Sequence, residues 1–489
     1  MAPHTANDIP PRLLMWQRVR EYAVPPSMIE TATARRAAGD WAGACAAARI
    51  DTDLDLRAVR HRHGTDLASR LRTDLRRLAP DLLRWHMPRI APDGLLRPGL
   101  TLTLARYRTH CTAPLHLVVR TPPAWADAGQ RMSLTLWEGP ADDAPRHHPH
   151  PHPDRRFRLD LHRHLWDATR CGELARRCGA YGTPGPEPSG PPPDLGRTDA
   201  SEAPWAVERW AAEAELLLRA EGRARGAFTV RLGARSRAVF ELAAPDDHHV
   251  PSLRPLREPL PAQEAAALPV LPEAASRVLP DLELLRAALV PPGRLHPLVA
   301  AALPVPPGSA PEPAPAAGTG DPHRVACRGE THRIALRDGV LTAVDHDPAQ
   351  LRREELLVAL GGPALPCLRA IDAVHREPEA LPAVRERLRH GDVTGALAVV
   401  EGLLGRAAVL RDGPLRDALE SAAARRVDHG LFRSGLVAVH PAARTADGGT
   451  ARGGDRGAAD HRPRFDRRMP RAMRDKRAAL GRPRTGLTR

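Results

Sequence analysis

Proline-rich segments interrupt this chain repeatedly and limit how much of it can form one continuous fold. Prolines are dense from Pro251 to Pro322, and low-complexity insertions run from Pro145 to Pro153 and from Gly182 to Pro193. Because proline removes a backbone donor and interrupts helices and strands, folded structure is expected between these segments. The pattern predicts an α+β fold in five parts. They are 1–95, a helical region; 96–250, an antiparallel β-rich domain with His/Pro-rich loops; 251–322, a Pro-rich linker with one helical pair; 323–430, a small β-meander plus helical hairpins; and 431–489, a disordered basic tail.

The first part carries helical periodicity. Leu67, Leu71, Leu75 and Leu78 are spaced four, four and three residues apart, which places them on one face of a helix beginning near Thr65. A short helix is expected to follow from a first-turn proline at position 80 to Pro88, where it ends.

Alternating apolar residues predict strands in the second part. Four strands of an antiparallel meander are expected at Leu100–Tyr107, Leu115–Val119, Met132–Trp137 and Phe157–Leu161. A helix carrying Leu165, Trp166 and Leu174 is expected next, and then a hairpin formed by Phe228–Leu232 and Ala238–Leu242.

The later parts combine helices with a small sheet. A helical pair is expected at Asp281–Leu289 and Leu295–Leu303, inside the predicted linker. Strands are expected at Val325–Cys327, His332–Leu336 and Val340–Val344, the last two joined at Asp338-Gly339. A helix from Asp347-Pro348 to Gly361-Gly362 follows, and further helices reach about Arg426.

One pattern occurs twice. Residues 39–46 and 391–398 both match G-D-x-x-G-A-x-A, each between an Arg-rich helix and an apolar one. Glycine ends the first helix, and Asp40 or Asp392 is expected to cap the second. The small pairs Gly43/Ala44 and Gly395/Ala396 are expected to let the two helices approach closely. Each copy therefore predicts an αα-hairpin.

The second copy, extended through Leu403-Leu404-Gly405 and Arg411-Asp412-Gly413 to Leu419, resembles a single degenerate ankyrin repeat of about forty residues. It lacks the T-P-L-H turn, and no further copy follows. The blocks Val24–Met28 and Trp85–Arg89 resemble a family of uncharacterised proteins from GC-rich bacteria. That resemblance implies no function.

Basic charge is concentrated at the C-terminal end. Positions 441–489 hold thirteen arginines and Lys476, the only lysine of the chain, against five aspartates, so 14 − 5 gives +9 of the total +14. This segment can bind nucleic acid electrostatically, or can be a solvated extension. The lack of other lysines excludes a phosphate-binding loop with its lysine, a protein kinase site and a pyridoxal-phosphate Schiff base.

No strong motif for catalysis or metal binding is present. His147, His148, His150 and His152, with Asp142, Asp143 and Asp154, favour adventitious metal binding on an extended loop. Cys171 and Cys178 lie about 10.5 Å apart along a predicted helix, too far for one zinc ion. Asp51, Asp53 and Asp55 resemble the start of a calcium loop, but Leu56 and Arg62 occupy its glycine and glutamate positions. Adjacent His110 and Cys111 would point to opposite faces of a strand, and Asp246–His249 is expected to be a polar loop. No catalytic residue, no cofactor and no tight metal site are therefore expected.

These observations favour a non-enzymatic cytoplasmic protein that binds a protein partner. The six cysteines are scattered, no apolar run is long enough to span a membrane, and the N-terminal residues do not resemble a signal peptide. The alternatives are a nucleic-acid-associated protein that binds through its basic tail, and an enzyme without a local motif, because a catalytic site can be assembled from distant residues.

Overall fold

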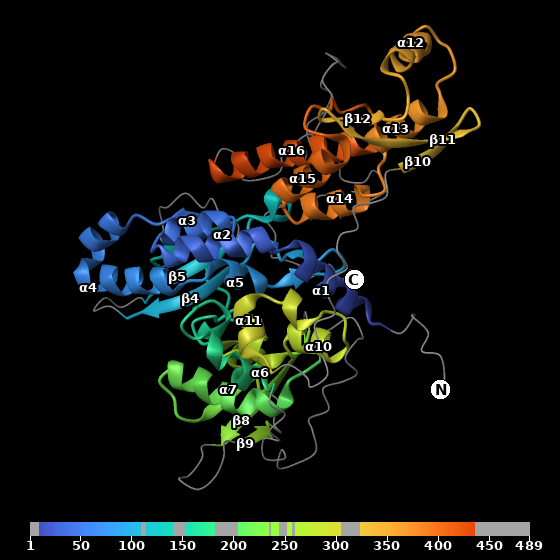
Figure 1. The fold of residues 1–489 in the computed structure, drawn as a ribbon. Coiled ribbons are helices and arrows are strands. Elements are labelled where there is room, and N and C mark those ends of the chain that lie inside the picture. Colours follow the sequence, from blue (N-terminus) through green and yellow to red (C-terminus); the bar gives the residue numbers. More distant parts are fainter. Residues whose placement is uncertain are drawn as a thin grey trace, which may run out of the picture. The chain divides into compact units, whose positions relative to one another are not determined.

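The computed structural model describes residues 9–108, 114–139, 152–180, 204–233, 236–243, 252–256, 260–304 and 323–435. Contacts divide the chain into two units, and Figure 1 shows their elements. The described residues from 9 to 304 belong to the first unit, except 128–130, which group with residues 323–435 in the second. Both units combine helices with antiparallel strands, which confirms the predicted α+β class.

Helices dominate the start of the first unit. They are α1 (Pro11–Tyr22), α2 (Pro26–Ala37), α3 (Trp41–Ala47), α4 (Leu56–Arg77) and α5 (Pro80–Trp85). The backbone of Gly64 is non-helical, with φ of 86°, so the regular second half of α4 begins at the predicted position. Its leucine stripe is buried, and Pro80 is the first residue of α5, as expected.

A four-stranded sheet lies beside these helices in the order β1-β6-β5-β4. Its strands are β1 (Ile50–Asp53), β4 (Thr101–Tyr107), β5 (Leu115–Arg120) and β6 (Met132–Trp137), while β2 (Arg89–Ile90) and β3 (Leu95–Leu96) form a separate small hairpin. The antiparallel pairs β4–β5 and β5–β6 confirm three of the predicted strands. The edge strand β1 was not predicted, and it pairs with β6 in parallel.

The predicted fourth strand, Phe157–Leu161, is wrong. This segment touches the sheet through two backbone hydrogen bonds, Thr103 N–H to Phe157 O at 3.1 Å and Asp160 N–H to Thr103 O at 2.9 Å. Local bonds such as Leu161 N–H to Arg158 O curl its backbone into turns. The alternation arose because Phe157 and Leu159 are buried while Arg158 and Asp160 are only half-buried.

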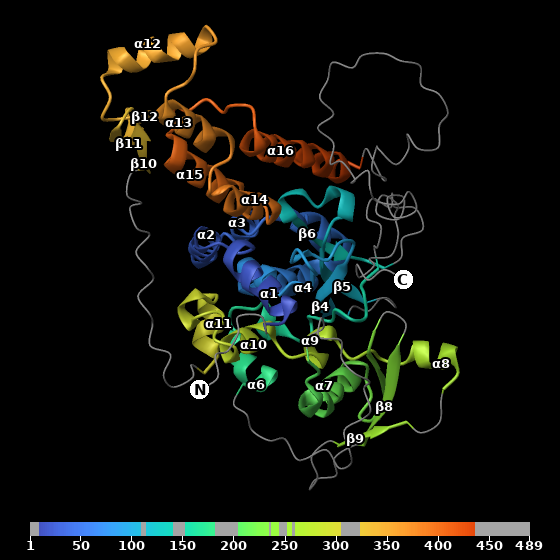
Figure 2. The same cartoon turned by 90° about the vertical axis from the view of Figure 1, so that its right-hand side faces the viewer.

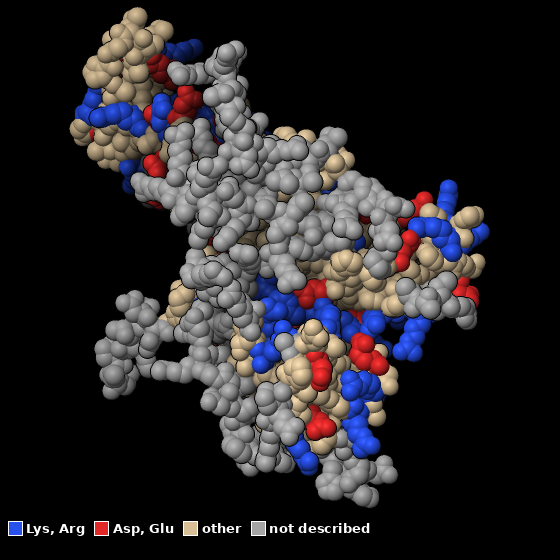
Figure 3. All heavy atoms as spheres, turned by 180° about the vertical axis from the view of Figure 1, so that it is seen from behind, with Lys and Arg blue, Asp and Glu red and all other residues tan. Residues whose placement is uncertain are grey.

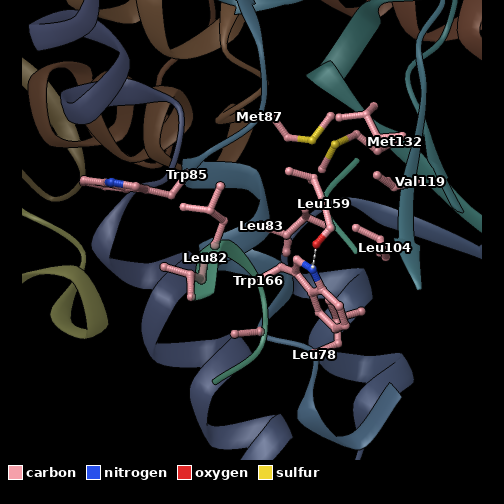
Figure 4. Close-up of a cluster of buried hydrophobic side chains, with 14 of the residues drawn as sticks. Leu78, Leu82, Leu83, Trp85, Met87, Leu104, Val119, Met132, Leu159 and Trp166 are labelled. Atoms are coloured by element: carbon pink, nitrogen blue, oxygen red, sulfur yellow. Dashed lines mark hydrogen bonds between the residues drawn. The ribbon is translucent and has the colours of Figure 1, made fainter. Parts of the chain in front are cut away.

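The core of this unit lies between α4, α5 and the sheet. Figure 4 shows Leu78, Leu82 and Leu83 packed with Leu104, Val119 and Met132 from the strands. Trp166 packs in the same cluster, and its indole Nε1 donates a hydrogen bond to Leu159 O at 2.9 Å. The predicted helix around Trp166 is instead a series of short turns, η3 (Arg163–Leu165), η4 (Cys171–Glu173) and α6 (Leu174–Cys178).

The rest of the first unit contains a second, smaller core. Helix α7 (Val207–Ala220), which was not predicted, packs on a three-stranded sheet of β7 (Gly226–Arg231), β8 (Arg237–Ala243) and β9 (Ser252–Pro255). The predicted hairpin is confirmed, with Phe228 opposite Phe240. Trp210 lies edge-on against Phe240, with ring centroids 5.5 Å apart.

The described part of the predicted linker is not a spacer. Residues 260–304 form α8 (Ala262–Ala267), α9 (Glu273–Ser276), α10 (Pro280–Arg286), η5 (Pro292–Arg294) and α11 (Pro297–Ala302). Leu284 and Val299 are buried in the same core as the N-terminal helices. Prolines occupy the first position of α10 and α11, where a missing N–H costs no hydrogen bond. The proline density therefore marks short helices that pack on the core. The same core draws on residues from 13 to 303, so this unit spans the first three predicted parts.

The second unit follows the predicted order of elements. Its sheet consists of β10 (His323–Cys327), β11 (Glu330–Arg337) and β12 (Val340–Ala343), and its helices are α12 (Pro348–Ala359), α13 (Pro366–Arg376), α14 (Leu381–Arg389), α15 (Val393–Leu404) and α16 (Pro414–Arg433). Asp338 and Gly339 both have positive φ, as the two-residue hairpin requires. Asp347 caps α12 through the N–H groups of Ala349 and Gln350. Further short turns, in neither sheet, are η1 (Ala124–Ala126) and η2 (Ala128–Gln130).

Both copies of the repeated pattern form helical hairpins, α2–α3 and α14–α15. Asp40 accepts a hydrogen bond from Gly43 N–H at 2.8 Å, and Asp392 accepts one from Gly395 N–H at 3.1 Å. The prediction about the two small glycines needs correction. A Cβ at Gly43 or Gly395 would lie 2.1 or 2.0 Å from an oxygen of the capping aspartate. The paired helix contributes only Nη1 of Arg387, at 3.0 Å, to the three nearest neighbours of the Gly395 position, and it contributes no atom to those of Gly43. Glycine is required there because the cap folds over it.

Candidate functional site

The surface of α12 carries the most unusual exposure of apolar side chains among the described residues. Leu356 and Leu357 on the helix, and Leu360 just after it, are 65 %, 46 % and 86 % exposed. Positions three and four apart share a helix face, so these residues form one stripe, here called the α12 stripe. Leu351 is the buried residue of this helix. Figures 1 and 2 both show α12 standing away from the other elements of its unit.

Both ends of α12 are well defined. The Asp347 cap starts the helix, and Gly361, with φ of 89°, ends it. Gly362 N–H bonds back to Leu357 O at 2.8 Å, as in a Schellman motif. The stripe therefore lies on a helix that is fixed at both ends and is not an unfolded apolar segment.

A cluster of two thiols and one imidazole lies at the base of the α12 segment. Cys327 ends β10, His346 follows β12 directly before the cap residue, and Cys367 lies in the first turn of α13. All three are buried, and one ligand atom from each lies within 4.8 Å of the others. We call these residues the Cys–His–Cys cluster.

Burial and mutual contact set the protonation of this cluster. Burial, together with a hydrogen bond between the two thiols, raises the pKa of Cys367 to about 11. Burial and the neighbouring His332 lower the pKa of His346. The rings of His332 and His346 stack with centroids 4.0 Å apart. The raised pKa of Cys367 and the lowered pKa of His346 both favour the neutral forms of these two side chains near neutral pH.

No local motif joins these three residues in the sequence. Separations of 19 between Cys327 and His346, and 21 between His346 and Cys367, follow no local metal-binding spacing. Cys327 ends a predicted strand and His346 precedes a predicted helix cap, but no predicted boundary falls at Cys367. Only the packing of α13 on the sheet brings them together.

The residues weighed for metal binding in the sequence do not form a site among the described residues. Asp154 pairs with Arg156 at 2.6 Å, and His152 is exposed, while His147, His148, His150, Asp142 and Asp143 lie outside the described residues. Asp55 caps α4, and Asp51 on β1 pairs with Arg131. Cys178 is buried and Cys171 is half-buried; both are free thiols. His110, Cys111 and Asp246–His249 lie outside the described residues.

Buried charges in the first unit serve to join helices. Arg20 of α1 makes two hydrogen bonds of 2.8 Å to Asp281 of α10, and both side chains are almost fully buried. Trp85 Nε1 donates to the same carboxylate at 3.1 Å, and the Arg20 guanidinium lies 4.3 Å from a ring centroid of Trp85. His296 bonds to the buried Asp81 at 3.0 Å. The contacts of Asp281 and His296 tie α10 and α11 to the N-terminal helices, which is a structural role.

Several arginines of the first unit form ion pairs with acidic side chains. On the face shown in Figure 3, basic (blue) and acidic (red) side chains of the first unit are intermixed. In the same unit, Arg158 pairs with Asp160 at 2.8 Å and with Glu221 at 2.6 Å.

Comparisons with known proteins give no match. Protein-family models, curated protein sequences and solved structures were each searched with this chain, and none resembles it significantly. Among the described residues, no helix combines the length and apolarity that a membrane span needs. The functional argument therefore depends on the α12 stripe and the Cys–His–Cys cluster themselves.

Proposed function

We propose that the protein is a non-enzymatic, cytoplasmic protein–protein interaction protein and that the α12 stripe is part of its contact surface. The observation that carries this proposal is the exposure of Leu356, Leu357 and Leu360 on one helix face. An amphipathic helix of this kind fits an apolar groove on a partner, with its leucines as anchors. The free thiols of the described cysteines support a reducing compartment.

Burial of the stripe would supply the association energy. Leucine side chains that leave water contribute about 1.5–3 kcal/mol each when fully buried. Three such anchors, clustered on one helix, can form the centre of an interface, whereas isolated exposed residues cannot. Val409 is 82 % exposed but stands apart from the stripe, so it offers a matched control.

An affinity pull-down from the native host tests the proposal. The full chain, the L356E/L360E variant and the V409E variant are used as baits, and captured proteins are quantified by mass spectrometry. We expect at least one partner that wild type and V409E capture equally and that L356E/L360E loses. Capture that is equal for all three baits would contradict a role for the stripe. Light scattering on the same proteins identifies self-association, the outcome in which the groove belongs to a second copy.

A second candidate function is nucleic-acid binding through residues 441–489. It is favoured by the net charge of +9 in that segment. With Phe465 as its single aromatic residue, the segment offers little base stacking, so binding should be electrostatic and should fall steeply between about 50 and 200 mM salt. Deletion of 441–489 should abolish it. Salt-resistant binding that survives the deletion would point to a reader elsewhere in the chain.

A further inference from the structure

The geometry of the Cys–His–Cys cluster matches a metal site more closely than a packed apolar core. In a tetrahedral zinc site, bonds of about 2.3 Å to sulfur and 2.0–2.1 Å to nitrogen place the ligand atoms about 3.5–3.8 Å apart. The ligand atoms of Cys327, His346 and Cys367 all lie within 4.8 Å of one another, so small side-chain movements would bring them to that separation.

An unpartnered polar atom points to a ligand. His346 Nε2 is buried and has no hydrogen-bond partner among the described residues. A buried nitrogen without a partner is unusual, because its desolvation is not compensated. A metal ion bound by an imidazole nitrogen of His346 would remove this deficit, with the other ring nitrogen left to carry the proton.

The local structure favours thiolates once a cation is present. Cys367 is the second residue of α13, an eleven-residue helix. The free N–H groups at a helix N-terminus stabilise negative charge. Cys327 is followed by Arg328 and Gly329, both with positive φ, so the chain turns back immediately and the thiol is held at the strand end. Two thiolates and one imidazole select zinc or a similar soft divalent ion over calcium or magnesium, which prefer oxygen ligands.

We propose that Cys327, His346 and Cys367 bind a single Zn²⁺ ion, with water in the fourth position. Binding converts two thiols to thiolates and releases their protons, so the two negative charges balance the charge of Zn²⁺. The hydrogen bond between the two thiols is replaced by two zinc–sulfur bonds. This site differs from the His-rich segment at 147–152, which the sequence analysis considered for metal.

The position of the ligands also gives the ion a role. His346 immediately precedes the α12 segment and Cys367 immediately follows it, while Cys327 ends β10. The ion would therefore link both ends of the segment 347–366, which contains α12, to the end of β10, and would fix the orientation of the α12 stripe. This second step rests on the proposed function, whereas the zinc site itself does not.

Metal analysis of the untagged full chain tests the site. Purified under reducing conditions and dialysed against a mild chelator, wild type should keep about one zinc per chain. A variant with His147, His148, His150 and His152 all replaced by alanine should keep it as well. C327S, C367S and H346A should each lose most of it, while C171S and H375A, whose residues lie outside the cluster, should not.

A spectroscopic measurement makes the test independent of variant folding. Wild-type protein stripped of zinc and reloaded with Co²⁺ should show the intense visible absorption of tetrahedral cobalt and a sulfur-to-metal charge-transfer band. The heat of zinc binding, measured by titration in buffers that differ in protonation enthalpy, should show that about two protons are released near neutral pH. Wild type with well under one zinc, or with zinc lost only in the four-histidine variant, would overturn the site. A Cys327–Cys367 disulfide that persists in protein purified under reducing conditions would also overturn the site.

Partner capture separates the two proposals. If the ion fixes the presentation of the stripe, stripped protein should capture less of the partner and reloading should restore it. Zinc bound by the cluster with no effect on capture would overturn the presentation role and leave the site. Loss of capture in L356E/L360E at full zinc content would support the stripe independently of the metal.

Discussion

The glycine in the repeated pattern gives a prediction whose sign depends on the neighbouring cap. Gly395→Ala would place a Cβ 2.0 Å from the carboxylate oxygen of Asp392. That oxygen also accepts a hydrogen bond from Arg387 at 2.9 Å, while the other accepts one from Gly395 N–H. The new methyl group must displace the carboxylate, so the variant loses the cap although alanine is a better helix former than glycine.

The magnitudes follow from these contacts. Loss of an aspartate cap costs about 0.5–2 kcal/mol, and Asp392→Ala should reach the upper end because its side chain is only 5 % exposed and also pairs with Arg387. Alanine in place of glycine returns about 1 kcal/mol inside a helix. Gly395→Ala should therefore be neutral to destabilising by about 1 kcal/mol in wild type, and stabilising by about 1 kcal/mol in the Asp392→Ala background.

Urea unfolding measured by far-UV circular dichroism gives the four free energies of this double-mutant cycle. All eight tryptophans lie between Trp16 and Trp210. Their fluorescence therefore reports the first unit and serves as an internal control that should not change. The pair Asp40 and Gly43 in the first unit should show the same reversal of sign, followed by fluorescence. The reversal should be smaller there, because the side chains of Arg35 and Asp40 are 59 % and 39 % exposed. Equal effects of Gly395→Ala in both backgrounds would refute the cap explanation.

Three further predictions concern stability. Burial lowers the pKa of His86 to about 4, below its unfolded value, so the unfolded chain binds a proton first as the pH falls. The free energy of unfolding should therefore drop by about 3 kcal/mol between pH 6.5 and 4. A His86→Gln variant, with unfolding followed by tryptophan fluorescence, should lack this drop. Asp281→Ala leaves the buried Arg20 without its bidentate partner and should cost about 3–5 kcal/mol in urea unfolding, whereas a cost below about 1 kcal/mol would show that the pair is not buried in solution. Removal of residues 436–489, which have few apolar anchors, should leave the melting temperature unchanged in calorimetry, and a fall of several degrees would show that the segment docks.

Local patterns in the sequence determined much of the secondary structure. The leucine stripe of α4, the first-turn proline of α5, the Asp338-Gly339 hairpin and the Asp347 cap all act within a few residues of themselves. Their physical causes are helix periodicity, the fixed φ of proline and local hydrogen bonding, which a single sequence displays. The same reasoning located both G-D-x-x-G-A-x-A hairpins and their caps.

Tertiary contacts decided what those patterns could not. Phe157–Leu161 alternates like a strand, but local hydrogen bonds curl its backbone into turns, and the indole of Trp166 bonds to its Leu159 O. Residues 260–304 resemble a linker, yet the partner of the buried Asp281 lies 261 positions earlier, at Arg20.

Local sequence patterns could not predict the Cys–His–Cys cluster either. Its three residues stand at the ends of separate elements and meet only because α13 packs on the sheet. Periodicity and caps act over a few residues and are written in the order of the chain, whereas burial and the meeting of distant side chains depend on how the elements pack.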